Sequence, residues 1–241
     1  MQIDGAVALV TGGNRGLGEQ FVKALLDAGA AKVYAAARNP GSVRVPGAVP
    51  IALDVTDPAS VRTAAEQAQD VTLLVNNAGT STGAAILDGE LGAYRTEFET
   101  HVLGTLDVSR AFAPVLARNG GGAVLNVLSV LSWVTMPGSA AYAAAKSAEW
   151  SMTNALRVAL AEQGTQVTSL HVGYMDTDMT AAVTAPKLDP AAVARTALDG
   201  VRDGLHEVLA DDLSKQVKAG LAADLTALYP QLATGAVSAT G

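Results

Sequence analysis

The sequence of 241 residues predicts an α/β protein that forms one doubly wound parallel sheet in a single domain. Short apolar runs alternate along the chain with stretches whose apolar residues recur at helical spacing, as expected for strands joined by crossover helices. The first apolar run ends in a turn rich in glycine. The length suits one large α/β domain, and the sequence shows no internal repeat and no second domain.

The composition excludes several classes of protein. Apolar residues make up 49% of the chain, enough for a large core, and the formal net charge of −7 argues against a nucleic acid or an anionic membrane as partner. The chain contains no cysteine, so disulfide and thiolate chemistry are excluded. The first residues lack the basic region of a signal peptide, and no apolar run reaches the roughly 18 residues of a membrane span. We therefore expect a cytoplasmic protein with a small-molecule partner.

The first strand, turn and helix resemble a phosphate-binding unit. Residues 6–10 are an apolar run, and glycines follow at positions 12, 16 and 18, before apolar residues at helical spacing up to Gly29. Glycines let the backbone approach a diphosphate, and a helix N-terminus supplies free N–H groups. The spacing is G-x-x-x-G-x-G rather than the commoner G-x-G-x-x-G. The alternative is an ordinary tight turn.

The second strand, expected at residues 32–37, bears on the choice of cofactor. Its tip reads Ala36-Ala37-Arg38, without the acidic residue that holds the ribose hydroxyls in folds that prefer NAD. Arg38, together with Arg15 in the glycine turn, would instead meet a 2′-phosphate. Each charge-assisted hydrogen bond contributes roughly 1.5–3 kcal/mol, so the pair predicts NADP(H). The alternative is two solvated surface arginines.

The next elements follow the same alternation. Residues 39–50 are expected to form a loop, and residues 51–54 the third strand, after which Asp54 and Val55 could meet an adenine ring. Asp57-Pro58 predicts a helix start, with Asp as N-cap and Pro at the first helical position. Later strands are expected at 71–75, 123–128, 167–172 and 207–210, and later helices at 93–118, 142–162, 190–203 and 213–228.

Three further segments are assigned from their composition. Residues 173–188 lack clean periodicity between a strand and a helix, where a substrate lid would lie. Residues 230–241 are rich in Gly, Ala, Ser and Thr, which predicts a flexible tail. The helix at 93–118 has more apolar residues than one sheet face needs, which favours a subunit interface.

A proton-transfer site is predicted around Tyr142. On a helix, Tyr142 and Lys146 lie one turn apart on the same face. Ser129 precedes Tyr142 by thirteen residues, directly after an apolar run. A hydroxyl at a strand tip that faces a phenol and an ammonium group can move a proton. Tyr-x-x-x-Lys alone is a weak signal, and an exposed helix face is its alternative; together with Ser129 and the glycine turn it becomes a strong one.

With these motifs in order, the chain resembles the short-chain dehydrogenase/reductase family over roughly residues 5–210. The resemblance implies a Rossmann fold and NAD(P)-dependent oxidation of alcohols or reduction of carbonyls. It implies that Tyr142 donates the proton in reduction, that Ser129 holds the substrate oxygen, and that Lys146 binds the nicotinamide ribose and lowers the pKa of the phenol from its usual value near 10. The residues expected to bind the cofactor are Gly12, Asn14, Arg15, Gly16, Leu17, Gly18, Arg38, Asp54, Val55, Asn77, Ala78, Gly79, Tyr142, Lys146, Gly173, Met175 and Thr177.

Departures from the family pattern concern His101 most directly. The family usually has Asn at this position, so His101 could replace it in a water relay to Lys146, titrate in its own right, or serve the structure. Val172 stands where the family usually has Pro, and the connection between the second and third strands is short. His171 and His206 are interpreted as structural. No His/Asp/Glu cluster has metal-ligand spacing, so we expect no metal.

Three functions remain open from the sequence. The first is an NADPH-dependent carbonyl reductase, acting on a ketone or an aldehyde by reversible hydride transfer. The second is an imine reductase on the same scaffold, prompted by His101. The third is a non-catalytic protein that senses NADP(H) or acts as a scaffold. Family habit suggests a homotetramer or a homodimer.

Overall fold

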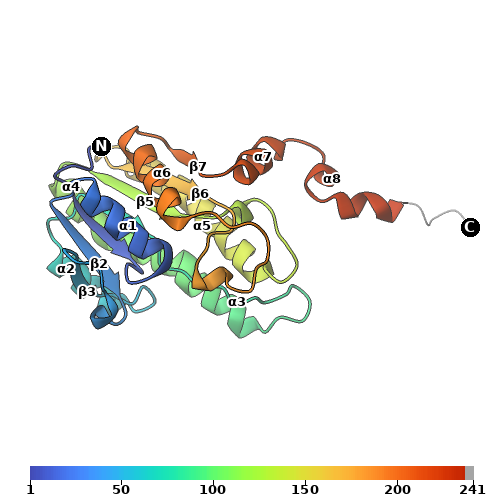
Figure 1. Cartoon of the computed structure of the whole chain (residues 1–241), viewed down its shortest axis with the longest axis horizontal. Coiled ribbons are helices and arrows are strands. Elements are labelled where there is room, and N and C mark those ends of the chain that lie inside the picture. The colour runs from blue at the N-terminus through green and yellow to red at the C-terminus, as the bar shows by residue number, and fades with distance from the viewer. Residues whose placement is uncertain (237–241) are drawn as a thin grey trace, which may run out of the picture.

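The computed structural model describes residues 1–236, and in them one parallel sheet forms the centre of the molecule (Figure 1). The described strands lie in the order β3-β2-β1-β4-β5-β6-β7, and every pairing is parallel. The predicted single-domain doubly wound fold class is therefore confirmed. The strands are β1 Val7–Thr11, β2 Lys32–Ala37, β3 Val49–Ala52, β4 Leu73–Asn76, β5 Ala123–Val127, β6 Gln166–His171 and β7 Glu207–Leu209.

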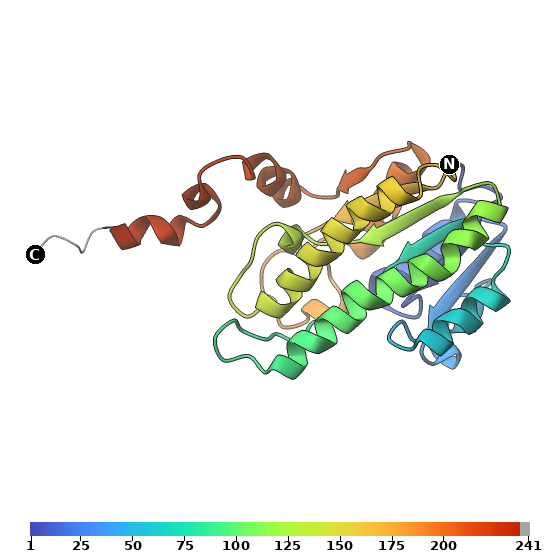
Figure 2. The same cartoon turned by 180° about the vertical axis from the view of Figure 1, so that it is seen from behind.

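Helices cover both faces of the sheet. Helices α1 (Gly16–Asp27) and α6 (Pro190–Arg202) lie on the face seen in Figure 1, and α2 (Pro58–Gln67), α4 (Thr105–Arg118) and α5 (Ala140–Ala159) lie on the other (Figure 2). Successive side chains of a strand point to opposite faces, so each strand contributes side chains to two hydrophobic cores, one on each face of the sheet.

The two cores follow this alternation. Val10 joins Phe21 on one side of the sheet, whereas its neighbour Leu9 joins Phe112 on the other. All four side chains are fully buried, and burial of each contributes about 1.5–3 kcal/mol. Strands β1 and β4 read as apolar runs up to their last residue because both of their faces are covered.

Two helices begin as the sequence predicts. The Asp57 side chain accepts a hydrogen bond from the Ala59 N–H at 2.9 Å, and Asp189 accepts one from the Ala191 N–H at 2.9 Å. In both cases Pro occupies the first helical position. The cap removes an unpaired N–H and the Pro ring is already set for helical φ, so these boundaries are specified locally.

The long helix predicted at 93–118 is continuous but not uniform. It begins as α3 (Leu91–Phe98), passes through the π-helical segment η2 (Glu99–Gly104) and continues as α4. Gly104 allows the close approach that this wider turn requires, because a Cβ at that position would lie 2.9 Å from the Val55 carbonyl oxygen. The π-helical segment presents His101 to the interior.

The third strand differs from the prediction. It starts at Val49, includes Pro50 and ends at Ala52, whereas a strand at 51–54 was expected. Proline has no N–H to donate, but β3 is the edge strand of the sheet, where one side of the strand needs no partner. The preceding loop also contains the short 3₁₀ helix η1 (Pro40–Ser42).

The prediction of a single helix at 213–228 is wrong. The chain forms α7 (Asp212–Gly220), breaks, and starts again as α8 (Leu225–Leu228). The break follows from Asp224, which accepts a hydrogen bond from the Thr226 N–H at 2.9 Å and so caps a new helix. Residues 230–236 then form the 3₁₀ helix η5 (Pro230–Ala236), and the rest of the predicted tail lies outside the described residues.

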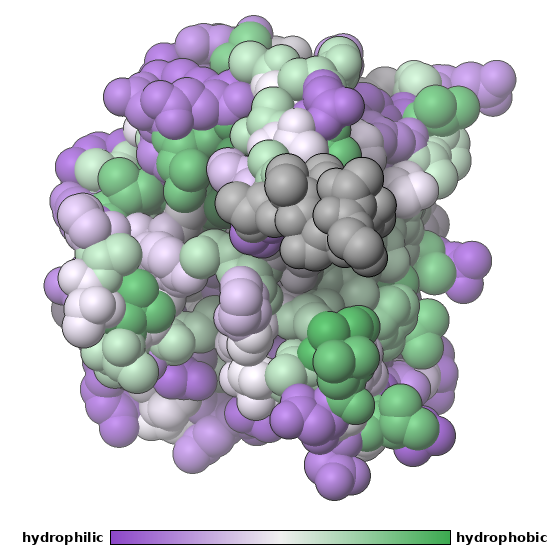
Figure 3. Space-filling view, turned by 90° about the vertical axis from the view of Figure 1, so that its right-hand side faces the viewer, coloured by the Kyte–Doolittle hydropathy of each residue, from purple (hydrophilic) through white to green (hydrophobic). Residues whose placement is uncertain are grey.

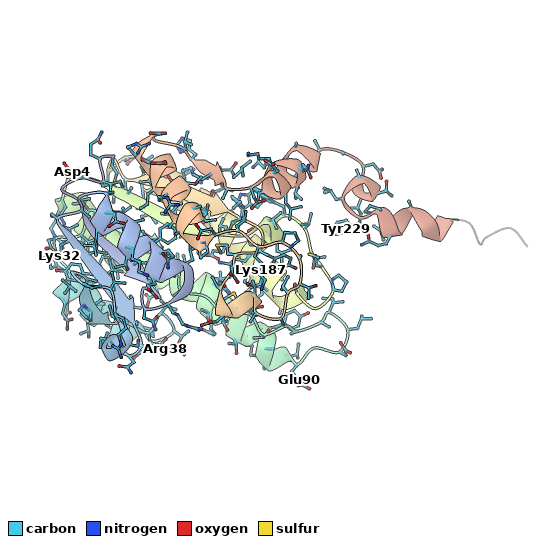
Figure 4. The ribbon with its side chains drawn as sticks, viewed as in Figure 1. Asp4, Lys32, Arg38, Glu90, Lys187 and Tyr229 are labelled. Atoms are coloured by element: carbon cyan, nitrogen blue, oxygen red, sulfur yellow. The ribbon has the colours of Figure 1, made fainter. Side chains whose placement is uncertain are left out.

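Residues 221–236 project from the body as an arm (Figures 1 and 2). Its Tyr229 hydroxyl accepts a hydrogen bond from the Thr135 N–H at 3.0 Å, and Figure 4 shows this tyrosine on the arm. The face seen in Figure 3 carries separate apolar groups among polar ones. None of the helices in residues 1–236 is both long and apolar enough to cross a membrane.

Candidate active site

A cleft of about 600 Å³ lies at the carboxyl end of the sheet. It spans the point between β1 and β4 where the strand order reverses, the usual ligand site of open parallel sheets. All residues that the sequence predicts for catalysis or cofactor binding line this cleft. They are Gly12, Asn14, Arg15, Gly16, Leu17, Gly18, Arg38, Asp54, Val55, Asn77, Ala78, Gly79, His101, Ser129, Tyr142, Lys146, Gly173, Met175 and Thr177.

The glycine turn is shaped to receive an anion. Helix α1 begins at Gly16, and no side chain caps its first turn, so its N–H groups stay open to the cleft. A Cβ on Gly18 would lie 2.1 Å from the Gly12 carbonyl oxygen, so only glycine permits this closed turn. Free N–H groups at a helix N-terminus fit a diphosphate, and the turn therefore suits a dinucleotide.

The segment after β4 is held against this turn. The Thr11 hydroxyl oxygen accepts hydrogen bonds from the N–H groups of Asn77 and Ala78, both at 2.9 Å. The Asn77 amide in turn donates to the Thr11 carbonyl at 2.9 Å. These contacts fix the floor of the cleft between the glycine turn and the catalytic side.

The two arginines predicted for a 2′-phosphate have different surroundings. Figure 4 shows Arg38 at the carboxyl end of β2, and its charge helps to lower the pKa of Asp54. Burial tends to raise that pKa, but hydrogen bonds from Thr56 together with Arg38 outweigh it. Arg15 forms an exposed ion pair with Asp178 at 3.2 Å, which contributes little to stability and can be exchanged for another anion.

Ser129, Tyr142 and Lys146 converge on the cleft. Ser129 follows β5 and starts the 3₁₀ helix η3 (Val130–Ser132), where its hydroxyl oxygen accepts the Leu131 N–H at 3.1 Å. The Ser129 side chain also helps to lower the pKa of the Tyr142 phenol. The Lys146 Nζ lies 5.8 Å from the centre of the Tyr142 ring and donates to the Val127 carbonyl at 2.7 Å.

The pKa of Tyr142 depends on burial and on more charges than that of Lys146 alone. Burial raises the pKa of the phenol; Lys146 and Ser129 lower it, but Glu149 and Glu97 raise it again, and the net direction is upward. Burial would lower the pKa of Lys146, but Glu149 and Tyr142 outweigh it and raise that pKa. In the protein alone, Tyr142 is thus a protonated phenol beside a charged ammonium group.

His101 lies at the edge of this group but does not touch Lys146. Its Nε2 is 2.9 Å from the Thr80 carbonyl oxygen and 3.2 Å from Glu97 Oε2, and its ring packs edge-on to Tyr142 with centroids 5.3 Å apart. Its Nδ1 is 3.8 Å from Glu149 Oε2, which lies 2.6 Å from Lys146 Nζ. Glu149 therefore occupies the position between His101 and Lys146 where a water was expected.

Sequence reasoning missed Glu97 and Glu149. A signal was present, because Glu149 is three residues after Lys146 and Glu97 is four residues before His101, spacings that place each pair on one helix face. Among the described residues, no group of three or more His, Cys, Asp or Glu side chains could hold a metal ion.

His171 supports the site from behind. Its Nδ1 lies 3.2 Å from the Ser129 carbonyl oxygen, and its ring stacks on Trp133 with centroids 3.9 Å apart. Burial lowers its pKa from 6.5 to about 4, partly opposed by the contact with Ser129. The side chain is fully buried and neutral, in agreement with a structural role, whereas His206 is exposed.

We expect His171 to make the folded protein sensitive to acid. The folded-state pKa is depressed, so the unfolded chain binds a proton first as the pH falls through 6.5, and stability is lost down to about pH 4. The full loss is about 3 kcal/mol, from a gap of about 2.5 pKa units at 1.36 kcal/mol each. Urea unfolding of His171→Phe and the wild type between about pH 7 and pH 4.5 measures it. The variant should show a shallower fall with pH, and exposed His206→Gln should match the wild type; equal slopes for all three would contradict the assignment.

The segment proposed as a lid is folded back on itself beside the glycine turn. Met175 pairs with Leu188 in an isolated β-bridge, and between them lies the 3₁₀ helix η4 (Asp178–Thr180). The Arg15–Asp178 ion pair connects this segment to the glycine turn across the mouth of the cleft.

Known proteins resemble the chain over most of its length. Residues 6–188 match the family model described as short chain dehydrogenase. Carbonyl reductase [NADPH] 2 of Sus scrofa is 32% identical over 191 residues, which cover 77% of this chain and 78% of that protein. An uncharacterised oxidoreductase of Methylorubrum extorquens is 31% identical over 226 residues, 87% of this chain and 90% of that protein. The crystal structure of a short chain dehydrogenase from Burkholderia cenocepacia in complex with NADP superposes with a TM-score of 0.92 at 40% identity, covering 96% of this chain and 99% of that one.

Proposed function

Since the chain belongs to the short-chain dehydrogenase family of oxidoreductases, we propose that it reduces a ketone or an aldehyde to an alcohol with NADPH, reversibly. The observation that supports this most is the convergence of Ser129, Tyr142 and Lys146 on the same cleft as the glycine turn. A nicotinamide cofactor held between them would supply the hydride.

The residues present fit such a cofactor. The open N–H groups of α1 and the turn around Gly16 and Gly18 would hold the diphosphate. Arg38 and Arg15 would meet the 2′-phosphate, and Lys146 the nicotinamide ribose. The segment 173–188 would cover the bound molecules as a lid.

In reduction, Tyr142 gives its phenolic proton to the carbonyl oxygen of the substrate. Ser129 donates a hydrogen bond to the same oxygen and holds it at the phenol. The Lys146 ammonium group then stabilises the phenolate that remains. Because burial and Glu149 keep the pKa of Tyr142 high, the phenol is in the form that reduction requires at neutral pH.

The proposal favours NADP(H) over NAD(H) because Arg15 and Arg38 line the cleft where the ribose would bind, and β2 contributes no carboxylate there. The Burkholderia cenocepacia relative, 40% identical, is in complex with NADP, and the Sus scrofa relative is named for NADPH. We also propose a homodimer or homotetramer in the cytoplasm. In support, Leu103 is 50% exposed in the π-helical segment η2 and Val158 is 79% exposed on α5.

The proposal is tested by following the loss of NADPH absorbance with a panel of ketones and aldehydes. We expect turnover with at least one member of the panel and saturation by NADPH. If no carbonyl compound is turned over although NADPH binds, the protein is a sensor or a scaffold, the alternative that the sequence left open.

Imine reduction is the second candidate function. The observation that favours it is the pair of buried carboxylates, Glu97 and Glu149, whose charges lie close enough to Tyr142 to shift the pKa of its phenol. Buried negative charge would stabilise a cationic iminium substrate more than a neutral ketone. Comparison of kcat/KM for a ketone and the matching cyclic imine separates the two.

Arg38→Asp is expected to reverse part of the cofactor preference. The substitution removes a cation from the ribose end and adds an anion, so the ratio of kcat/KM for NADPH over NADH should fall at least about tenfold, the value of one charge-assisted hydrogen bond. Steady-state kinetics with both cofactors measure the ratio. The matched control is Arg44→Asp, an exposed arginine of the same connection that does not line the cleft. An unchanged ratio for Arg38→Asp would refute the role of this arginine.

A further inference from the structure

Helix α7 has no part in the mechanism given above, yet its contacts lead to two sides of the cleft. Figure 1 shows this helix between β7 and the arm. Of its nine residues only Ser214 is buried, so burial of apolar side chains contributes little to holding it in place. The position of α7 therefore depends on a few specific contacts at its two ends.

Asp211, directly before α7, connects the helix to the segment proposed as a lid. One of its oxygens, Oδ1, accepts the Ser214 N–H at 2.7 Å and caps the helix. The other, Oδ2, accepts the Gly173 N–H at 2.7 Å and the Ser214 hydroxyl at 3.2 Å. Hydrogen bonds to a carboxylate are stronger than those between neutral groups. Asp211 thus uses one oxygen for the helix and shares the other with the lid.

Gly173 is the place where the lid segment, residues 173–188, leaves the sheet. It follows β6 closely and lines the cleft. The base of the segment is closed by a backbone hydrogen bond from the Leu188 N–H to the Tyr174 carbonyl oxygen at 2.8 Å. The Asp211 carboxylate therefore holds the first residue of a closed loop, and so fixes the base of the lid.

Lys218, in the last turn of α7, contacts the turn that carries Ser129. Its Nζ lies 4.9 Å from the centre of the Trp133 ring and 2.8 Å from Glu207 Oε2. A cation over the face of a tryptophan is attracted to it. Trp133 ends η3, the 3₁₀ helix that Ser129 begins. The Trp133 ring also stacks on His171, which contacts the Ser129 carbonyl oxygen.

The middle of α7 packs against the same turn. Val217 lies against a small core that includes Val130 and Leu131 of η3, and Tyr142 packs against that core as well. The helix therefore contacts the segment that places Ser129, and it shares a core with Tyr142.

We propose that α7 holds the base of the lid at a fixed distance from the turn of Ser129, with Asp211 and Lys218 as positioning residues for carbonyl reduction. The two residues are seven positions apart, so they lie on one face of the helix about two turns from each other. Because backbone hydrogen bonds fix that spacing, a displacement at one end is passed to the other. This inference rests on the proposed reductase function.

The connection joins cofactor binding to the placement of the substrate oxygen. Thr177 of the lid segment lies beside the glycine turn, since a Cβ on Gly16 would be 3.6 Å from Thr177 Cγ2. A displaced base at Gly173 would weaken the contact of the lid with the cofactor site, and a displaced η3 would move Ser129. With α7 between them, loss of either end contact should weaken both functions.

Hydrogen exchange of the Gly173 amide in the cofactor-free protein tests the connection. Asp211→Ser keeps a helix cap, because a serine oxygen can accept the Ser214 N–H, but it leaves no second oxygen for Gly173. The amide should exchange about tenfold faster, the value of one charge-assisted hydrogen bond. Lys218→Met should also raise the exchange rate of this amide, although Lys218 does not contact it.

Matched controls separate this effect from general loosening. Asp224→Ser alters the cap of α8, and Lys215→Met breaks an exposed ion pair on the outer face of α7. Both should leave the exchange of the Gly173 amide as in the wild type. Lys218→Arg keeps a cation for the tryptophan face and should do the same. If Lys218→Met leaves the exchange rate unchanged, the two ends of α7 are not connected and the proposal is overturned.

Turnover supplies the second measurement. Asp211→Ser and Lys218→Met should each raise the Kd of NADPH and lower kcat/KM for a carbonyl by about tenfold, since a displacement of about 1 Å can cost up to about 10²-fold. In the double variant kcat/KM should fall no further than in the weaker single variant, because both substitutions break one connection. Multiplied losses would refute the shared connection. The exchange measurement requires neither cofactor nor substrate, whereas wild-type turnover reports on the proposed function alone.

Discussion

Tyr142→Phe is expected to lower kcat/KM for carbonyl reduction by about 10²–10⁴-fold, the range typical of a lost general acid. The phenyl ring fills the same space beside His101 and Lys146, so the cleft keeps its shape. NADPH binding, measured by fluorescence titration, should stay within a few fold of the wild type. The expected fall in kcat/KM therefore reflects loss of proton transfer and not loss of cofactor binding.

A matched substitution elsewhere shows that the effect belongs to the site. Tyr34→Phe also deletes a phenolic hydroxyl. That hydroxyl donates to Asp70 at 2.9 Å, and neither residue lines the cleft. Its removal should cost about 1 kcal/mol of stability and leave kcat near the wild-type value. Full turnover in Tyr142→Phe would refute the assigned role.

Lys146→Met is expected to lower the free energy of unfolding by about 3–5 kcal/mol, in addition to abolishing most turnover. Lys146 is 4% exposed, and its ammonium group is 2.6 Å from Glu149. Without it, the Glu149 carboxylate stays in the core with its partner cation gone, and the Val127 carbonyl loses a donor. Urea unfolding at neutral pH measures the change.

The double variant isolates the buried charge as the cause. Lys146→Met combined with Glu149→Leu should recover much of the stability, because no ionised group is then left alone. The control is Lys215→Met, which breaks an exposed ion pair with Asp212 at 3.0 Å and should cost at most about 1 kcal/mol. A single variant no less stable than the wild type would show that the Lys146–Glu149 pair does not hold the core together.

The layout of the sheet was predictable because its central strands are apolar on both faces. Such strands read as nearly continuous apolar runs, as β1 and β4 do, and the glycine turn marks the first crossover. Local side-chain caps at Asp57 and Asp189 also gave correct helix starts. The prediction failed where a local contact competes with the apolar pattern. Asp224 caps a new helix and so divides the helix predicted at 213–228.

The placement of the candidate site residues around one cleft was predictable because the positions repeat a familiar order along the chain. The electrostatics were not, since the pKa of Tyr142 depends on burial and on carboxylates from two other turns of helix. Glu97 and His101 follow helical spacing, but their meeting with Glu149 depends on how α5 packs against the segment that carries them. No pattern of single-helix spacing contains that information.

Pro50 has a consequence for the protein in concentrated solution. It lies in β3, the strand that terminates the sheet on one side, and removes an N–H that a strand from another molecule would need as donor. Pairing of a strand from another molecule with β3 is therefore disfavoured. The same residue that made this strand hard to recognise protects the protein against aggregation.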